Sequence, residues 1–121
     1  KKRCEIIAGS NADIVVSIHQ NSFSDSRVSG AQVFYYKHSV EGQKLAECIQ
    51  DSMREGLDET NDRKIKPNDS YYMLIHTPCP TVIVECGFIT NYDEAALLVT
   101  EEYQENVADA IAAGIMSYKR E

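Results

Sequence analysis

Two polar residues, His19 and Glu85, follow apolar, β-prone runs of sequence, and their side chains could do chemistry together. His19 comes directly after the run 13–18 (DIVVSI), and Glu85 comes directly after the run 81–84 (TVIV). In open α/β sheets, the ligand crevice lies at the carboxyl ends of the strands. Histidine is the commonest metal ligand, and a carboxyl group among apolar walls has a pKa raised toward the range of a general base. If the two strands are parallel neighbours, the pair predicts a metal ligand beside a proton shuttle.

Other roles for these residues stay open on spacing alone. A histidine at a strand end is often structural, and a glutamate leaving a strand often pairs with a basic residue. Cys86 could also act as a thiol nucleophile with His19 as its base. Since successive strand residues point to opposite faces, only one of Glu85 and Cys86 can join His19. His38 and His76 are expected to be surface histidines.

The sequence predicts strands that alternate with amphipathic helices. The expected strands are the buried runs 13–18 and 81–84, an aromatic strand 31–36 that presents some side chains to a cleft or to solvent, and a short strand 71–75. The segment 1–8 resembles the end of a helix closed by Gly9, the segment 20–30 a surface loop, and the segment 58–70 a mobile connection. Tyr35-Tyr36 and Tyr71-Tyr72 could line a carbohydrate or peptide groove, or be ordinary half-exposed aromatic residues of strands.

Apolar periodicity predicts three further helices. Residues 40–58 repeat apolar side chains every four positions behind an N-cap at Ser39. Asn91 and Glu94 have the spacing of a capping box for a short helix that ends near residue 98. Thr100 should cap the last helix, whose expected apolar face is Val107, Ala108, Ile111, Ala112 and Ile115. The fold class is therefore α/β, with a central, mostly parallel or mixed sheet and helices on both faces.

Composition excludes several classes of protein. A chain of 121 residues is the size of one domain. Its net charge of −7 argues against nucleic acid as a partner, since that binding depends on basic side chains. No apolar stretch approaches the roughly 18 residues of a membrane span. The four cysteines have neither disulfide-scaffold nor zinc-site spacing and are expected to behave as small hydrophobic residues, which leaves the redox compartment open.

Two segments carry a resemblance to a known family. Residues 12–22 (ADIVVSIHQNS) and 84–91 (VECGFITN) resemble segments of the zinc-dependent N-acetylmuramoyl-L-alanine amidases of type 3, which cleave bacterial peptidoglycan. The two segments occur in the family's order, with matching helices between and after them, so the resemblance covers essentially the whole chain. Residues 29–36 (SGAQVFYY) and 102–104 (EYQ) are most similar to the branch that acts on spore cortex during sporulation and germination.

This resemblance implies roles for three residues. His19 would be a Zn²⁺ ligand and Glu85 the catalytic carboxylate. The zinc ion would polarise the scissile amide carbonyl and acidify a bound water, while Glu85 takes the water's proton and passes it to the leaving L-alanine nitrogen. Asn21 would either contact the residues that surround the zinc ligand His19 or contact the substrate. The substrate implied by the resemblance would place the protein outside the cytoplasmic membrane, in the cell wall or spore cortex.

The resemblance also implies that part of the family's site lies outside this chain. The other two zinc ligands of the family, a histidine and a glutamate, belong to an N-terminal strand and helix that would precede Lys1. Residues 1–121 would then be the C-terminal two thirds of a single amidase catalytic domain. Such a chain should bind zinc poorly, hydrolyse nothing alone, and be unstable or self-associate through uncovered apolar surface. A noncatalytic peptidoglycan-binding domain with the amidase fold stays open, as does the need for an accessory protein.

Overall fold

The computed structural model describes all 121 residues. It contains five helices and four strands, joined by loops. In chain order these are α1 (Lys2–Ser10), β1 (Val15–Asn21), β2 (Gln32–Tyr36), α2 (Val40–Gly56), β3 (Lys66–Asn68), α3 (Tyr72–His76), β4 (Thr81–Phe88), α4 (Tyr92–Leu98) and α5 (Glu101–Lys119). None of the helices has the length and hydropathy of a membrane-spanning segment.

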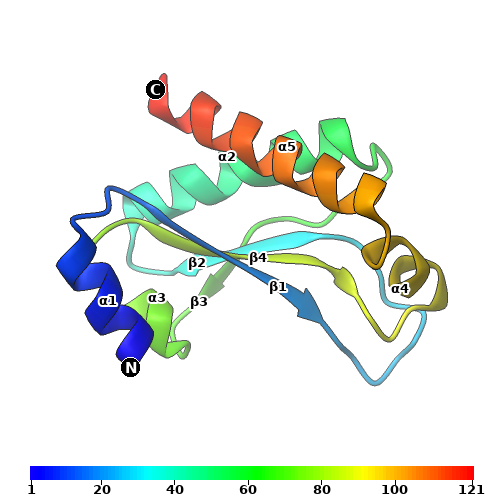
Figure 1. Ribbon diagram of the computed structural model, residues 1–121, viewed down its shortest axis with the longest axis horizontal. Coiled ribbons are helices and arrows are strands. Elements are labelled where there is room, and N and C mark those ends of the chain that lie inside the picture. The colour runs from blue at the N-terminus through cyan, green and yellow to red at the C-terminus, as the bar shows by residue number, and fades with distance from the viewer.

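The four strands form one mixed sheet in the order β1-β4-β2-β3. β1 runs parallel to β4, β4 antiparallel to β2, and β2 parallel to β3. Helices α2 and α5 cover one face of this sheet, and α1 and α3 lie on the other (Figure 1). The predicted α/β architecture is confirmed. The expectation of a buried strand over 13–18 was wrong, because β1 lies at one edge of the sheet with β4 as its only partner and is half-buried to exposed.

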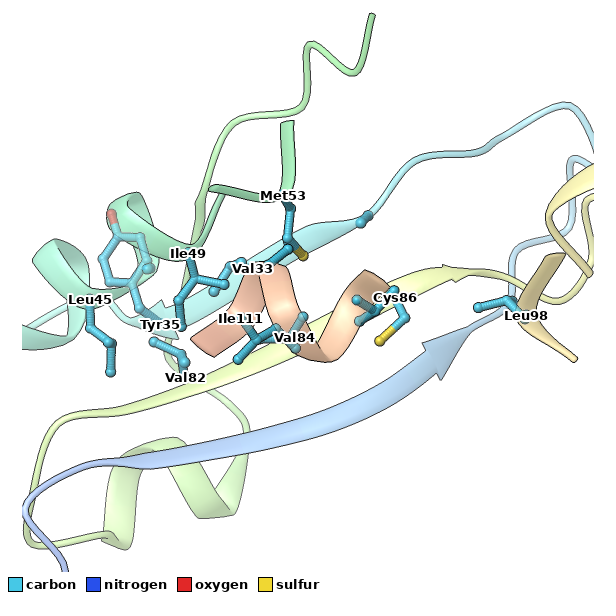
Figure 2. Packing of buried hydrophobic residues seen from close by; sticks show 14 residues of the cluster. Val33, Tyr35, Leu45, Ile49, Met53, Val82, Val84, Cys86, Leu98 and Ile111 are labelled. Carbon is cyan, nitrogen blue, oxygen red and sulfur yellow. The ribbon is translucent and has the colours of Figure 1, made fainter. Parts of the chain in front are cut away.

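The main core lies between the sheet and the helices α2 and α5. Figure 2 shows Val33 and Val84 of the sheet facing Ile49 of α2 and Ile111 of α5. All four are at most 5% exposed, and a fully buried side chain of this size contributes about 1.5–3 kcal/mol. A smaller cluster of Phe34, Leu74 and Ile83 holds α3 to the opposite face. The two clusters together fix β4 as a strand that is buried along its whole length.

Three predicted helix starts are confirmed by side-chain hydrogen bonds. Ser39 accepts from the N–H of Gly42 at 2.9 Å, Asn91 from that of Glu94 at 3.0 Å, and Thr100 from that of Tyr103 at 3.2 Å. Each cap satisfies a backbone donor that the first turn of a helix leaves free. Local chemistry therefore fixes where α2, α4 and α5 begin.

Three predictions about the ends and connections were wrong. The first helix is closed by Asn11 in the left-handed conformation (φ 58°), not by Gly9. The segment 71–75 is not a strand: Tyr71 is the N-cap of the helix α3, and residues 72–75 lie within it. The side chain of Asn68 accepts from two following backbone N–H groups and turns the chain before residue 72. The connection 58–70 contains β3, which tolerates Pro67 because it lies at the edge of the sheet.

The buried faces of β2 and α5 also differ from expectation. Phe34 and Tyr35 are 8% and 7% exposed, so the middle of the aromatic strand packs between layers, and only Gln32 and Tyr36 at its ends are half-buried. In α5 the buried residues are Val107, Ala110, Ile111 and Gly114, whereas Ala108 and Ala112 are exposed. The small residues Ala110 and Gly114 let α5 approach α2 closely, which hydrophobicity alone does not reveal.

Candidate functional site

His19 and Glu85 lie side by side on the sheet. Both belong to strands, since β1 and β4 each continue past the predicted ends, and they are Cα partners in the parallel β1–β4 pairing. Partnered residues of neighbouring strands point their side chains to the same face. The condition set by the sequence, that the two strands be parallel neighbours, is therefore met. The carboxyl ends of β1 and β4, to which the two residues belong, lie toward α4 (Figure 1).

The side chain of Glu85 is buried. The residue is 9% exposed, and its Oε2 atom is buried without any hydrogen-bond partner in the chain. Burial raises the pKa of Glu85, and the charge of His19 opposes that shift. Buried polar atoms without partners are rare in native proteins. This carboxylate is thus well suited to take up a proton from a group that enters the site.

The imidazole of His19 is exposed beside this carboxyl group. Its Nε2 lies 2.8 Å from Oγ of Ser17, which precedes it by two residues and shares its face of the strand. Sequence reasoning missed Ser17, although an i, i+2 pair in a strand always shares one face.

The residues present match one part of a zinc site. His19 offers an imidazole nitrogen, and the unpartnered oxygen of Glu85 lies on the same face. However, no three His, Cys, Asp or Glu side chains come together as a metal-binding group. A catalytic zinc requires three protein ligands. His19 therefore matches one of the three ligands that such a site needs.

Asn21 ends β1 and ties it to the turn after β4. Its Oδ1 accepts from the N–H of Ser22 at 2.8 Å, and its carbonyl accepts from the N–H of Ile89 at 2.8 Å. The pairing shifts register between His19 and Asn21, so that Asn21 opposes Phe88. Such irregularities are common beside active sites because they re-aim side chains. The hydrogen bonds assign Asn21 a local structural role, and its contact with substrate stays a prediction.

Glu94 joins two backbone segments that flank the site, and sequence reasoning missed this role. Its carboxylate accepts from the N–H of Phe88 at 2.7 Å and from that of Gly30 at 2.9 Å. A capping box would instead direct this side chain to the N–H of Asn91. Gly87 has φ 155°, and a Cβ atom there would lie 3.1 Å from the same carboxylate. The turn after Glu85 is therefore shaped to receive Glu94.

Cys86 lies in the core behind the site. It is 6% exposed within the main cluster, and burial, reinforced by the charge of Glu85, raises the pKa of its thiol to about 11. A cavity of about 550 Å³ borders both Cys86 and His19, with Ile18 and Tyr103 among its walls. A nucleophilic cysteine needs a lowered pKa, so this environment opposes the thiol-hydrolase alternative.

The remaining histidines and cysteines form no second site. His38 and His76 are exposed, and each contacts a tyrosine ring, Tyr36 and Tyr72 respectively. All four cysteines are free. Cys4 and Cys86 are buried as expected, whereas Cys48 and Cys79 are only half-buried.

Comparison with known proteins identifies the family. Residues 1–117 match the family described as N-acetylmuramoyl-L-alanine amidase. The chain belongs to this amidase family. The match includes the two segments around His19 and Glu85 that carried the resemblance. The mixed sheet is therefore part of an amidase fold.

Individual amidases agree with this assignment. The chain is 38% identical to the germination-specific N-acetylmuramoyl-L-alanine amidase of Bacillus subtilis, over 98% of this chain and 49% of that protein. It superposes with a TM-score of 0.95 and 45% identity on the CwlD amidase from Clostridioides difficile, solved in complex with the GerS lipoprotein, covering 98% of this chain and 60% of that one. A second amidase, from Clostridium difficile 630, gives a TM-score of 0.91 at 30% identity, covering 98% of this chain and 64% of that one. The chain thus spans about half to two thirds of the length of these amidases.

Proposed function

We propose that this chain supplies the catalytic carboxylate and one metal-binding histidine of a peptidoglycan hydrolase. The reaction would be hydrolysis of the amide bond between N-acetylmuramic acid and L-alanine. The observation that carries the proposal is the pairing of His19 with Glu85 on one face of the β1–β4 ladder. Membership of the amidase family supports the same reaction.

Glu85 is proposed as the proton carrier of this reaction. Its buried carboxylate has a raised pKa and a free oxygen, so it can accept a proton from an attacking water and hold it. The same group can then deliver the proton to the nitrogen of the leaving L-alanine. Because Glu85 is buried, its neutral form is not strongly disfavoured between the two transfers.

His19 is proposed as one ligand of a zinc ion, as expected of a family whose members generally depend on zinc. When bound, such an ion supplies Lewis-acid polarisation of the scissile carbonyl and acidification of water. The further ligands would lie outside these 121 residues, so that the chain forms the C-terminal two thirds of a single catalytic domain. The short chain alone should then hold zinc weakly and cleave nothing.

The substrate and the relatives suggest where the protein works. Peptidoglycan lies outside the cytoplasmic membrane, so we propose an extracytoplasmic location, in the cell wall or spore cortex. Likeness to the germination-specific amidase of Bacillus subtilis favours the spore cortex. The CwlD amidase was solved with a lipoprotein, which makes a lipoprotein a candidate accessory partner here as well.

Zinc content and activity test this proposal together. We would measure zinc by elemental analysis, and release of L-alanine termini from peptidoglycan, for this chain and for the protein extended upstream. His19→Ala should abolish both zinc binding and cleavage in the extended protein, whereas the exposed His38→Ala should change neither. Stoichiometric zinc in the short chain, or cleavage that survives His19→Ala, would refute the assignment.

A noncatalytic peptidoglycan-binding domain is the second candidate function. It is favoured only by the incomplete set of metal ligands within the chain. Co-sedimentation of the extended protein with purified peptidoglycan, without any release of L-alanine termini, would establish it in place of the amidase.

A further inference from the structure

The distribution of positive charge around the sheet is uneven. Of the 12 lysines and arginines, four pair with a carboxylate, namely Arg27, Lys37, Lys44 and Arg54. The others lie in two places. One group is at the chain ends (Lys1, Lys2, Arg3, Lys119 and Arg120), and the second is the segment 63–66, with Arg63, Lys64 and Lys66. In an acidic protein, this second group is a local concentration of unpaired cations beside β2.

Two of these cations lie on the face of the sheet that carries Glu85. Gln32 of β2 is the Cα partner of Glu85, and its Oε1 accepts from Nη1 of Arg63 at 3.4 Å. Phe34 follows Gln32 by two residues in β2 and so lies on the same face. Lys66 of β3 is its Cα partner, and the Nζ of Lys66 lies 5.9 Å from the Phe34 ring. His19, Glu85, Gln32 and Arg63 therefore follow one another across the sheet.

The guanidinium of Arg63 is held in place but not saturated. Its Nε donates to the carbonyl of Ser29 at 2.7 Å, and its plane lies 5.0 Å from the centre of the Phe88 ring. Its Nη2 has no hydrogen-bond partner. Arg63 borders a small polar cavity together with Asp58 and Asp62. Neither carboxylate comes within 4.0 Å of the Arg63 guanidinium, so no ion pair forms. A fixed fork with free N–H groups is the geometry that recognises a carboxylate.

We propose that Arg63 and Lys66 form a carboxylate-binding subsite that anchors the acidic stem peptide of peptidoglycan while its first amide lies at Glu85. This inference rests on the proposed function. Neighbouring strands are about 4.8 Å apart, so Arg63, next to Gln32, lies about 10 Å across the sheet from Glu85. An extended peptide advances about 3.3–3.6 Å per residue. The acidic second and third residues of the stem peptide would therefore reach this subsite.

Peptide binding tests the subsite independently of cleavage. We would titrate the upstream-extended protein by calorimetry with the free stem peptide L-alanyl-γ-D-glutamyl-diaminopimelate, and with the same peptide after amidation of its carboxylates. Arg63→Gln and Lys66→Gln should each weaken binding of the free peptide by about tenfold, the usual effect of losing one charge-assisted hydrogen bond. Lys119→Gln removes the same charge on the opposite side of the sheet and should have no effect. The amidated peptide should bind weakly to every variant.

The outcomes separate this inference from the proposed function. Equal binding of the two peptides, or equal weakening by Lys119→Gln, would overturn the subsite even if the protein cleaves peptidoglycan. Charge-dependent binding lost on Arg63→Gln, without release of L-alanine termini, would support the subsite and overturn the amidase reaction. Lys66→Gln carries the test if Arg63→Gln does not fold, since Lys66 is exposed and its ammonium group lies over the Phe34 ring.

Discussion

Glu85 differs from the other buried polar residues in having an unsatisfied atom. Three polar side chains are buried in this protein: Gln50, Thr81 and Glu85. Gln50 bridges the N–H of Val33 and the carbonyl of Ala31, and Thr81 donates to the carbonyl of Cys79. Only Glu85 retains a buried oxygen without a partner. A carboxylate kept in this state costs stability, so its retention points to chemistry.

Replacing this carboxylate should separate activity from folding. Glu85→Gln in the upstream-extended protein should lower the rate of L-alanine release by about 10²–10⁴-fold, the usual contribution of a general acid–base group. Its free energy of unfolding should stay equal or rise, because an amide has no charge to desolvate. Urea unfolding at neutral pH measures this, with Glu47→Gln on the exposed side of α2 as the matched control. Full activity in Glu85→Gln would show that another group moves the proton.

Cys86 should be almost inert toward alkylation. With a pKa raised from 9.0 to about 11, its thiolate fraction at pH 8 is about a hundredfold lower than that of an ordinary cysteine. Iodoacetamide labelling followed by mass spectrometry should show slow modification of Cys86 in the folded protein and rapid modification in urea. Fast labelling that abolishes cleavage would restore the thiol-hydrolase alternative.

The same pKa shift predicts a loss of stability at alkaline pH. Because the folded state raises the pKa of Cys86, its thiol favours folding below pH 9.0, and that contribution is lost as the pH rises toward about 11. Cys86→Ala should therefore have a flatter dependence of the free energy of unfolding on pH over this range. An unchanged slope would mean that other groups, such as Tyr103 with its raised pKa, dominate the alkaline transition.

At the scale of secondary-structure elements, the contact between α2 and α5 depends on one glycine. A Cβ atom at Gly114 would lie 2.7 Å from the Cα of Ile49, so the two helix backbones would have to separate. Gly114→Ala should lower the free energy of unfolding by about 1–3 kcal/mol, although alanine favours helices. Gly9→Ala in α1 meets no atom within 4 Å and should be neutral or stabilising. Thermal unfolding of the two variants compares them directly, and equal melting temperatures would contradict the close-packing argument.

The two hydrogen bonds that Glu94 accepts from the backbone should contribute measurably to the free energy of unfolding. Glu94→Gln places an amide NH₂ where the carboxylate accepts from Phe88 or Gly30, so it should cost about 1–3 kcal/mol. Asp93→Asn makes the same charge change in the same helical turn, but Asp93 is exposed, and its effect should stay within about 0.5 kcal/mol. If the two variants unfold at the same urea concentration, the effect of Glu94 is only its charge at the helix end.

The elements also show what sequence patterns can predict. Caps at Ser39, Asn91 and Thr100 depend on residues within one turn, and the sequence predicted all three. β3 was missed because its pairing with β2 is non-local and its proline resembles a loop signal. His19 and Glu85 could be found because strand ends and motifs are local. Ser17 follows from the same local alternation and was overlooked. Gln32 and Glu94, by contrast, reach the site through strand register and long-range contacts, which periodicity does not specify.

At the scale of the whole molecule, apolar surface lies open beside the edge strand β1. Ile18 is 57% exposed and Ile89 51%, and both border the cavity of about 550 Å³. Exposed apolar patches of this kind favour association. Sedimentation velocity of the isolated chain should therefore show concentration-dependent self-association. Ile18→Ser should reduce it, whereas Val40→Ser, at an exposed site on α2, should not. A single monomeric species at all concentrations would contradict this expectation.

The topology of the sheet also affects when the site can form during synthesis. β1 pairs only with β4, which is made long after it, and the elements between them do not bring His19 a partner strand. Non-local parallel pairing is slow, and a chain leaves the ribosome at about 5–20 residues per second. His19 and Glu85 can therefore meet only after most of the chain has emerged. Under the proposed function, the growing chain therefore has no catalytic pair until β4 has been made.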